Sequence, residues 1–271
     1  MEILSEAFDA DAFFKRVRRE AVRVLFLDFD GTLAPFRADP SVVRPYEGVP
    51  GRLERIRGAG TRLVLVSGRP AAEVRERLGL EPAPEVWGTH GWERAPAGAR
   101  PGPVDLPEPA RRGLAAAAGR IGSSGAGRLE RKPAALALHV RGEEEGRASR
   151  ALAAAREAWE PVAGRFGLEL RPFDGGLELR VPGRDKGHAV RTVLAEAEPG
   201  AVAYLGDDDT DEDAFRALAG RGASVLVRPE LRPTAADAWI RPPDELLDFL
   251  DRWAEAAGAE ARAEPREGDE G

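Results

Sequence analysis

The chain has 271 residues, of which 42% are hydrophobic, with no cysteine and a formal net charge of −7 at pH 7. This length allows one large domain or a core with an insertion. The acidic balance excludes the basic surface that nucleic-acid or anionic-membrane binding requires, so we expect small-molecule partners. Without cysteine there is no disulfide framework or cysteine-bound zinc, which fits a cytoplasmic protein. No apolar run is long enough to span a membrane, and the acidic N-terminal stretch does not resemble a signal peptide.

The first hundred residues alternate between helical and strand patterns. Residues 5–20 have an amphipathic pattern that predicts a helix, and the apolar run at 24–27 predicts a strand buried on both faces. A short helix with apolar positions Val49, Leu53 and Ile56 follows, which Gly58 and Gly60 end, and then a second buried strand at 63–66. The turn Ser67-Gly68-Arg69 leads into a helix opened by Pro70, and residues 84–87 predict a third strand. This alternation is typical of a parallel sheet.

The pattern changes between residues 103 and 182. That stretch predicts helices at 107–121 and 144–166 and strands near 128–131, 134–140, 168–172 and 176–181, which together indicate an inserted α+β domain. The alternation then returns, with helices at 186–197 and 211–218, strands at 202–205 and 223–227, and a last helix through residue 253. We therefore predict an α/β fold with a Rossmann-like parallel-sheet core, residues 1–102 and 183–253. The inserted domain is residues 103–182, and residues 254–271 are predicted to be disordered.

Two carboxylates follow the first strand directly. Asp28 and Asp30 stand one residue apart at its carboxyl end, the edge of an open α/β sheet where ligands bind. Two such carboxylates repel each other unless a cation or a shared proton relieves them. Mg²⁺ suits this place because it takes carboxylate and carbonyl oxygens. A solvated strand end is the plainer reading, but it explains neither the Gly31-Thr32 that follows nor the residues below.

Other strand ends and helix starts bring matching chemistry to the same edge. Asp207 can complete a metal site with Asp28 and the carbonyl of Asp30, while Ser67 and Lys186 can hold phosphoryl oxygens. Each of these residues alone is ordinary, because an acidic turn, a serine cap or a surface lysine is common. Their order and spacing together predict a phosphate and magnesium site.

The same residues carry a family resemblance. In order, Asp28-Phe29-Asp30-Gly31-Thr32, Ser67, Lys186 and Gly206-Asp207-Asp208 match the four motifs of the haloacid dehalogenase superfamily of aspartate-nucleophile phosphatases, which the chain resembles. Within it, the chain is similar to the trehalose-6-phosphate phosphatases through Ser67-Gly68-Arg69, Gly88-Thr89-His90-Gly91, Glu130-Arg131-Lys132, His139-Val140-Arg141, Glu178 and the run from Gly206 to Phe215. The resemblance covers nearly the whole chain except the tail.

This resemblance implies a Mg²⁺-dependent hydrolase of trehalose biosynthesis, with the inserted domain as a cap and a functional link to a trehalose-6-phosphate synthase. Asp28 would attack phosphorus, and Asp30 would protonate the leaving sugar oxygen and later activate water. Ser67 and Lys186 would complete the catalytic set. The implied metal ligands are Asp28, Asp30 and Asp207, with Asp208 and Asp211 behind them. The implied substrate-binding residues are Arg69, Glu130, Lys132, Arg141 and Glu178.

Two positions depart from the family pattern. Phe29 stands where tyrosine is common, and Asp174 stands four residues before Glu178, where the family usually has a lysine for the sugar. Two alternatives therefore stay open. One is a capped phosphatase for another phosphorylated disaccharide or glucosyl compound, and the other is a non-catalytic module that binds a sugar phosphate or regulates a partner synthase. The complete set of Asp28, Asp30, Lys186 and Asp207 argues against the second.

Overall fold

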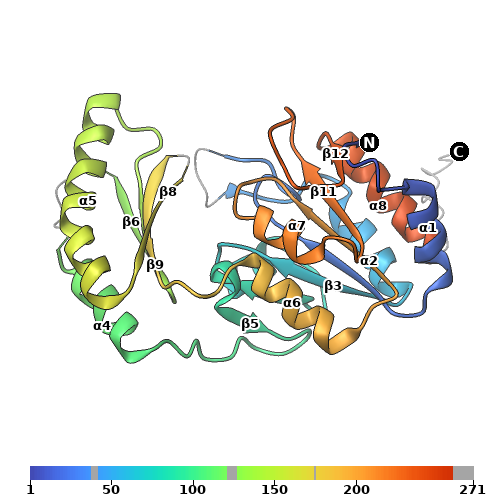
Figure 1. Cartoon of the computed structure of the whole chain (residues 1–271), viewed down its shortest axis with the longest axis horizontal. Coiled ribbons are helices and arrows are strands. Elements are labelled where there is room, and N and C mark those ends of the chain that lie inside the picture. The colour runs from blue at the N-terminus through green and yellow to red at the C-terminus, as the bar shows by residue number, and fades with distance from the viewer. Residues whose placement is uncertain (38–41, 121–126, 174, 259–271) are drawn as a thin grey trace, which may run out of the picture.

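The structure is a computed structural model that describes residues 1–37, 42–120, 127–173 and 175–258. Two units lie side by side in Figure 1, a larger one built on an eight-stranded sheet and a smaller one built on a four-stranded sheet. Two stretches of chain join them, and the labelled N-terminus lies on the larger unit away from the smaller one (Figure 1). We call the larger unit the core and the smaller unit the cap.

The core sheet is parallel except at its edges. Its order is β1-β12-β11-β10-β2-β3-β4-β5, and only the outermost strands β1 and β5 pair antiparallel. In register, Leu27 of the central strand β2 lies opposite Leu205 on one side and Leu65 on the other. The strands are β1 (Glu2–Ile3), β2 (Arg23–Leu27), β3 (Thr61–Val66), β4 (Glu85–Gly88), β5 (Glu93–Ala95), β10 (Ala201–Gly206), β11 (Ala223–Val227) and β12 (Ala238–Ile240).

Helices cover both faces of this sheet. One face carries α1 (Ala10–Arg19), α2 (Val49–Gly58), α3 (Ala71–Leu78) and α8 (Asp244–Ala256), and the other carries α6 (Lys186–Ala197) and α7 (Glu212–Leu218). Successive side chains of β2 alternate between the two layers. Leu25 and Leu27 pack in the first layer, while Val24 and Phe26 pack in the second. The strand is thus buried on both faces, which is why its sequence is continuously apolar.

The cap has its own sheet and its own hydrophobic core. Its strands β6 (Arg128–Lys132), β7 (Ala135–His139), β8 (Glu169–Phe173) and β9 (Gly176–Arg180) pair antiparallel in the order β6-β7-β9-β8. Helices α4 (Glu108–Ala118) and α5 (Glu145–Phe166) pack on one face of this sheet around the buried Trp159. In Figure 1 these helices lie on the side away from the core, so the other face of the cap sheet is turned toward it.

The predicted fold class is confirmed: the protein has a parallel α/β core and a second α+β unit. The short strands β1, β5 and β12 were not predicted. The first helix begins at Ala10 rather than at residue 5, because Asp9 caps it by accepting from the N–H groups of Asp11 and Ala12.

The last helix continues to Ala256, since Ala254 and Ala256 are buried, so the prediction of disorder is wrong for residues 254–256. Residues 259–271 lie outside the described ranges, and the domain limits at 103 and 182 stay a prediction. In the part of the chain that the structure covers, no helix is both long enough and apolar enough to cross a membrane.

Candidate active site

Three buried carboxylates meet at the carboxyl ends of β2 and β10. Asp28 follows β2, Asp207 follows β10, and Asp211 precedes α7; one oxygen of each lies within 4.8 Å of the others. The two strands are parallel neighbours, which brings the ends of segments about 180 residues apart in the chain to one place. The Oδ2 atom of Asp207 is buried and has no hydrogen-bond partner among the described residues. This cluster is the meeting of acidic strand ends that the sequence predicts.

A single buried lysine faces the cluster. Lys186 is the first residue of α6, which Asp185 caps by accepting from the N–H of His188 at 2.6 Å. The Lys186 Nζ lies 2.9 Å from Asp28 Oδ1 and 2.8 Å from Asp211 Oδ1, and the side chain is only 3% exposed. Burial opposes the charged ammonium, but Asp211 and Asp28 outweigh it and raise the pKa of Lys186 well above its usual value. The lysine is therefore a fixed positive charge.

One lysine does not balance three buried carboxylates. Burial raises the pKa of Asp28 from 3.8 to about 8; Lys186 lowers it, and Asp211 and Asp208 raise it further. Burial and the nearby Asp28 raise the pKa of Asp207 well above its usual value as well. Such shifts mark a site that favours bound protons or a cation. The all-oxygen donor set and the unpartnered Asp207 Oδ2 fit a hard divalent ion such as Mg²⁺.

Asp211 organises the acidic turn rather than pointing freely into it. Its Oδ2 accepts from the N–H groups of Asp207 and Asp208, each at 3.1 Å, and its Oδ1 accepts from the hydroxyl of Tyr204 at 2.6 Å. Asp208 accepts from the N–H and the hydroxyl of Thr210. The sequence analysis missed Tyr204, because a tyrosine inside a buried strand cannot be told from an ordinary core residue. Its place two residues before the Gly206-Asp207 turn was the available signal.

Asp30 lies in contact with Arg69. The Nε and Nη2 atoms of Arg69 donate to the two carboxylate oxygens of Asp30, at 2.5 and 2.7 Å, and its Nη1 donates to Glu73. Ser67 is buried, and its Oγ accepts from the N–H of Arg69 at 3.1 Å. The turn after β3 therefore reaches the reacting edge as predicted. The family resemblance assigns Arg69 to substrate binding. In this structure Arg69 holds Asp30, and its contact with a substrate stays a prediction.

Two of the predicted cap residues form a pair that touches the core. Lys132 of β6 lies 3.0 Å from Glu178 of β9, and the other oxygen of Glu178 lies 3.5 Å from His90 Nε2. Although burial opposes it, Lys132 and then His90 lower the pKa of Glu178. His90 has a left-handed backbone (φ 54°), and its ring occupies the space that a side chain at Gly68 would need. The sequence analysis included His90 in the motif Gly88-Thr89-His90-Gly91 but assigned it no role.

The other two predicted cap residues lie apart from this pair. Glu130 Oε2 accepts from His139 Nε2 at 2.6 Å, and this contact lowers the pKa of Glu130. The guanidinium carbon of Arg141 lies 5.9 Å from the centre of the Phe36 ring, which belongs to the core. Asp174, the departure noted in the sequence, lies outside the described residues.

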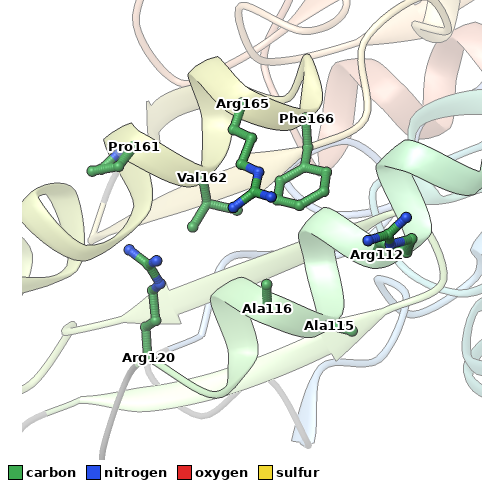
Figure 2. Close-up of a pocket in the computed structure, with 8 residues that line it drawn as sticks. All are labelled: Arg112, Ala115, Ala116, Arg120, Pro161, Val162, Arg165 and Phe166. Atoms are coloured by element: carbon green, nitrogen blue, oxygen red, sulfur yellow. The ribbon is translucent and has the colours of Figure 1, made fainter.

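A groove on the cap is separate from this site. It has a volume of about 350 Å³ and lies between α4 and α5, where Arg112, Arg120 and Arg165 surround an apolar floor that includes Val162 (Figure 2). These helices cover the side of the cap sheet that faces away from the core (Figure 1). The residues that line the groove include no carboxylate and no nucleophile. It therefore takes no part in the chemistry of the carboxylate cluster.

Comparison with known proteins agrees with this geometry. A sequence model described as trehalose-phosphatase matches residues 26–234. The trehalose-phosphate phosphatases of Mycobacterium avium (strain 104) and Mycobacterium marinum are 35% and 33% identical over 254 and 248 residues, and each match covers 85% of this chain. The chain spans 62% and 61% of their lengths.

Solved structures show the same fold. The C-terminal domain of the Candida albicans trehalose-6-phosphate phosphatase superposes with a TM-score of 0.75 at 20% identity, covering 94% of this chain and 99% of that one. An Aspergillus fumigatus trehalose-6-phosphate phosphatase gives 0.65 at 25% identity, covering 93% and 100%. The match over residues 26–234 and the identities to the curated relatives show that this chain belongs to the trehalose-phosphatase family.

Proposed function

We propose that this protein is a Mg²⁺-dependent phosphatase that hydrolyses trehalose 6-phosphate to trehalose and phosphate through an aspartyl-phosphate on Asp28. The observation that carries the proposal is the buried carboxylate cluster with Lys186 2.9 Å from Asp28 Oδ1. A solvated acidic turn would be exposed, whereas these side chains are buried. Membership of the trehalose-phosphatase family and the names of the curated relatives support the substrate.

The metal would be held at the edge between β2 and β10. Asp28 and Asp207 would supply carboxylate oxygens, and Asp30 would supply its main-chain carbonyl. Both oxygens of Asp211 already accept hydrogen bonds, from Lys186, Tyr204 and two main-chain N–H groups. Asp211 would therefore support the turn and not bind the metal directly. When bound, Mg²⁺ supplies positive charge that balances the carboxylates and the phosphate oxygens.

The core residues divide the chemistry between them. An oxygen of Asp28 forms a bond to phosphorus while the bond from phosphorus to the sugar oxygen breaks. Asp30 gives a proton to that leaving oxygen, and in the second step takes one from the water that attacks the aspartyl-phosphate. Lys186 balances the charge on the phosphoryl oxygens throughout. Arg69 keeps the Asp30 side chain at the reacting edge between these steps.

The cap residues would hold the sugar. Lys132 can donate to hydroxyl groups, and Glu178 and Glu130 can accept from them. Glu178 stays ionised because Lys132 and His90 stabilise its charge, so it keeps its acceptor character at neutral pH. The contact between Glu178 and His90 ties this sugar site to the turn that carries Ser67.

Phosphate release from a panel of substrates tests the proposal. Trehalose 6-phosphate, glucose 6-phosphate, another phosphorylated disaccharide and a small aryl phosphate are each assayed with Mg²⁺ and with EDTA. We expect the highest kcat/KM for trehalose 6-phosphate, no turnover in EDTA, and none for Asp28→Asn. Hydroxylamine, which cleaves acyl phosphates, should release phosphate from the trapped intermediate of the unmodified protein. A tenfold preference for another disaccharide would remove the substrate assignment, and turnover by Asp28→Asn would remove the mechanism.

The proposal extends to the setting of the reaction. We place the protein in the cytoplasm, which is supported by a chain of 271 residues without cysteine. Its substrate is a phosphorylated disaccharide, so a glycosyl-transfer reaction must supply it, and a trehalose-6-phosphate synthase is the functional partner that this chemistry requires. Cell fractionation would test the location. Phosphate release by the protein from sugar phosphates extracted from a strain that lacks the synthase would test the link to the synthase.

A further inference from the structure

A second cavity lies on the core, directly beside the carboxylate cluster. Its volume is about 380 Å³, within the range of small-molecule sites. Its apolar lining includes Phe36, Tyr46 and three prolines, and three charged residues, Asp207, Arg228 and Glu230, bring polar groups to it. An apolar wall with a few polar groups is the usual composition of a ligand site.

Phe36 is held beside the reacting edge with its ring open. A side-chain carbon at Gly31 would lie 2.7 Å from Phe36 Cε2 and 2.2 Å from Asp207 Oδ2, so the ring packs against the backbone next to Asp30. The Phe36 side chain is nevertheless 56% exposed. Leaving an aromatic ring in water forfeits much of the free energy that its burial would supply. A ring fixed in this place and more than half exposed presents apolar surface that a ligand can cover.

One group of the cap lies near the Phe36 ring. The guanidinium of Arg141 lies 5.9 Å from the centre of the Phe36 ring, and Gly175 packs against Arg141. On the core side, Arg228 donates from Nη1 to the carbonyl of Asp207, while its Nε is buried without a partner among the described residues. Phe36 therefore lies close to hydrogen-bonding groups of both units, Arg228 in the cavity and Arg141 on the cap.

We propose that this cavity is a subsite for a pyranose ring of the substrate, with Phe36 as the platform for the sugar. A pyranose has apolar C–H faces and a rim of hydroxyl groups, so it can cover an aromatic ring while its hydroxyls reach Arg141 and Arg228. The subsite lies next to Asp30, where the leaving sugar oxygen must be. This inference rests on the proposed function, because it assumes that the substrate is a sugar phosphate.

Truncation of the ring tests the subsite. In Phe36→Ala, kcat/KM for trehalose 6-phosphate should fall by about tenfold through a higher KM, because ground state and transition state lose the same contact. A small alkyl phosphate, which brings neither a sugar nor an aromatic ring to the platform, should keep its kcat/KM within about twofold. Phe36→Tyr keeps the ring and should retain the unmodified KM. Leu231→Ala is the matched control, since Leu231 is also exposed but does not line the cavity.

The outcomes separate this inference from the proposed function. If the unmodified protein does not hydrolyse trehalose 6-phosphate, the proposed function fails before the variant is measured. If it does, and Phe36→Ala loses activity on both substrates equally or on neither, the subsite is wrong. Inhibition by free trehalose gives an independent readout. Its inhibition constant should rise in Phe36→Ala and stay unchanged in Leu231→Ala, and equal constants in all three proteins would also overturn the proposal.

Discussion

The charge imbalance at the carboxylate cluster predicts that Asp28→Asn stabilises the metal-free protein. The pKa of Asp28 rises from 3.8 to about 8 on folding, so the folded protein binds more protons than the unfolded chain between these values. Its stability must therefore fall as the pH rises through this window. At about 1.4 kcal/mol for each tenfold change in proton affinity, the full ionisation cost is on the order of 6 kcal/mol.

Asparagine has the shape of aspartate but cannot ionise, so it avoids this cost. The pKa of about 8 already includes the attraction of Lys186, which stays paired with Asp211 in the variant, so we expect a net gain of about 3–5 kcal/mol at pH 8 and about 1–2 kcal/mol at pH 5. Urea denaturation in EDTA at pH 5, 6, 7 and 8 measures the free energy of unfolding of both proteins. A saturating concentration of Mg²⁺ should reverse the order, because binding to the folded state stabilises the unmodified protein. A difference between the two proteins in EDTA that does not change from pH 5 to pH 8 would refute the reasoning.

Three other substitutions probe the site. Lys186→Arg should lower kcat by about 10²-fold, because a planar guanidinium cannot take the place of a compact ammonium between two carboxylates, and an unchanged rate would exclude Lys186 from the phosphate. Glu178→Gln should raise KM for trehalose 6-phosphate by about 5- to 100-fold and leave an aryl phosphate unaffected, and equal changes for both substrates would argue against a sugar contact. Tyr204→Phe should cost about 1–3 kcal/mol of unfolding free energy, measured in urea, because Asp211 loses a buried donor; stability within 0.5 kcal/mol of the unmodified protein would show that water replaces the hydroxyl.

The regular elements of the fold were predictable where the pattern is long or clearly bounded. The helix Lys186–Ala197 has the predicted limits, because Asp185 caps its start. The strand Arg23–Leu27 is buried on both faces and therefore carries an unbroken apolar run. The strands β1, β5 and β12 have only two or three residues each, which is too short for any periodicity to appear. Their pairing is decided by neighbours that are remote in the chain.

The sequence predicted which residues belong to the site better than it predicted which of them contact each other. The sequence order places Asp28 and Asp207 at one edge because parallel strands end there together, and it places Lys186 beside them because the helix that leads to β10 starts at that edge. It does not say which way a side chain turns. Arg69 turns to Asp30, and His90 turns to Glu178, through torsions that only the surrounding packing selects. Whether Ser67, Glu130 and Arg141 touch a substrate stays a prediction.

Because the cap is inserted between the core strands β2 and β10, it also sets the order in which parts of the protein can fold during translation. β2 leaves the ribosome with Asp28, but β10 follows only after the whole cap, about 170 residues later. At about 5–20 residues per second, this interval is on the order of 10–35 seconds. During it, the cap sheet can form from strands that are close in the chain, while Asp28 remains hydrated and ionised without cost. The desolvation of three carboxylates is thus deferred until β10 enters beside β2, at a time when Lys186 has already been made.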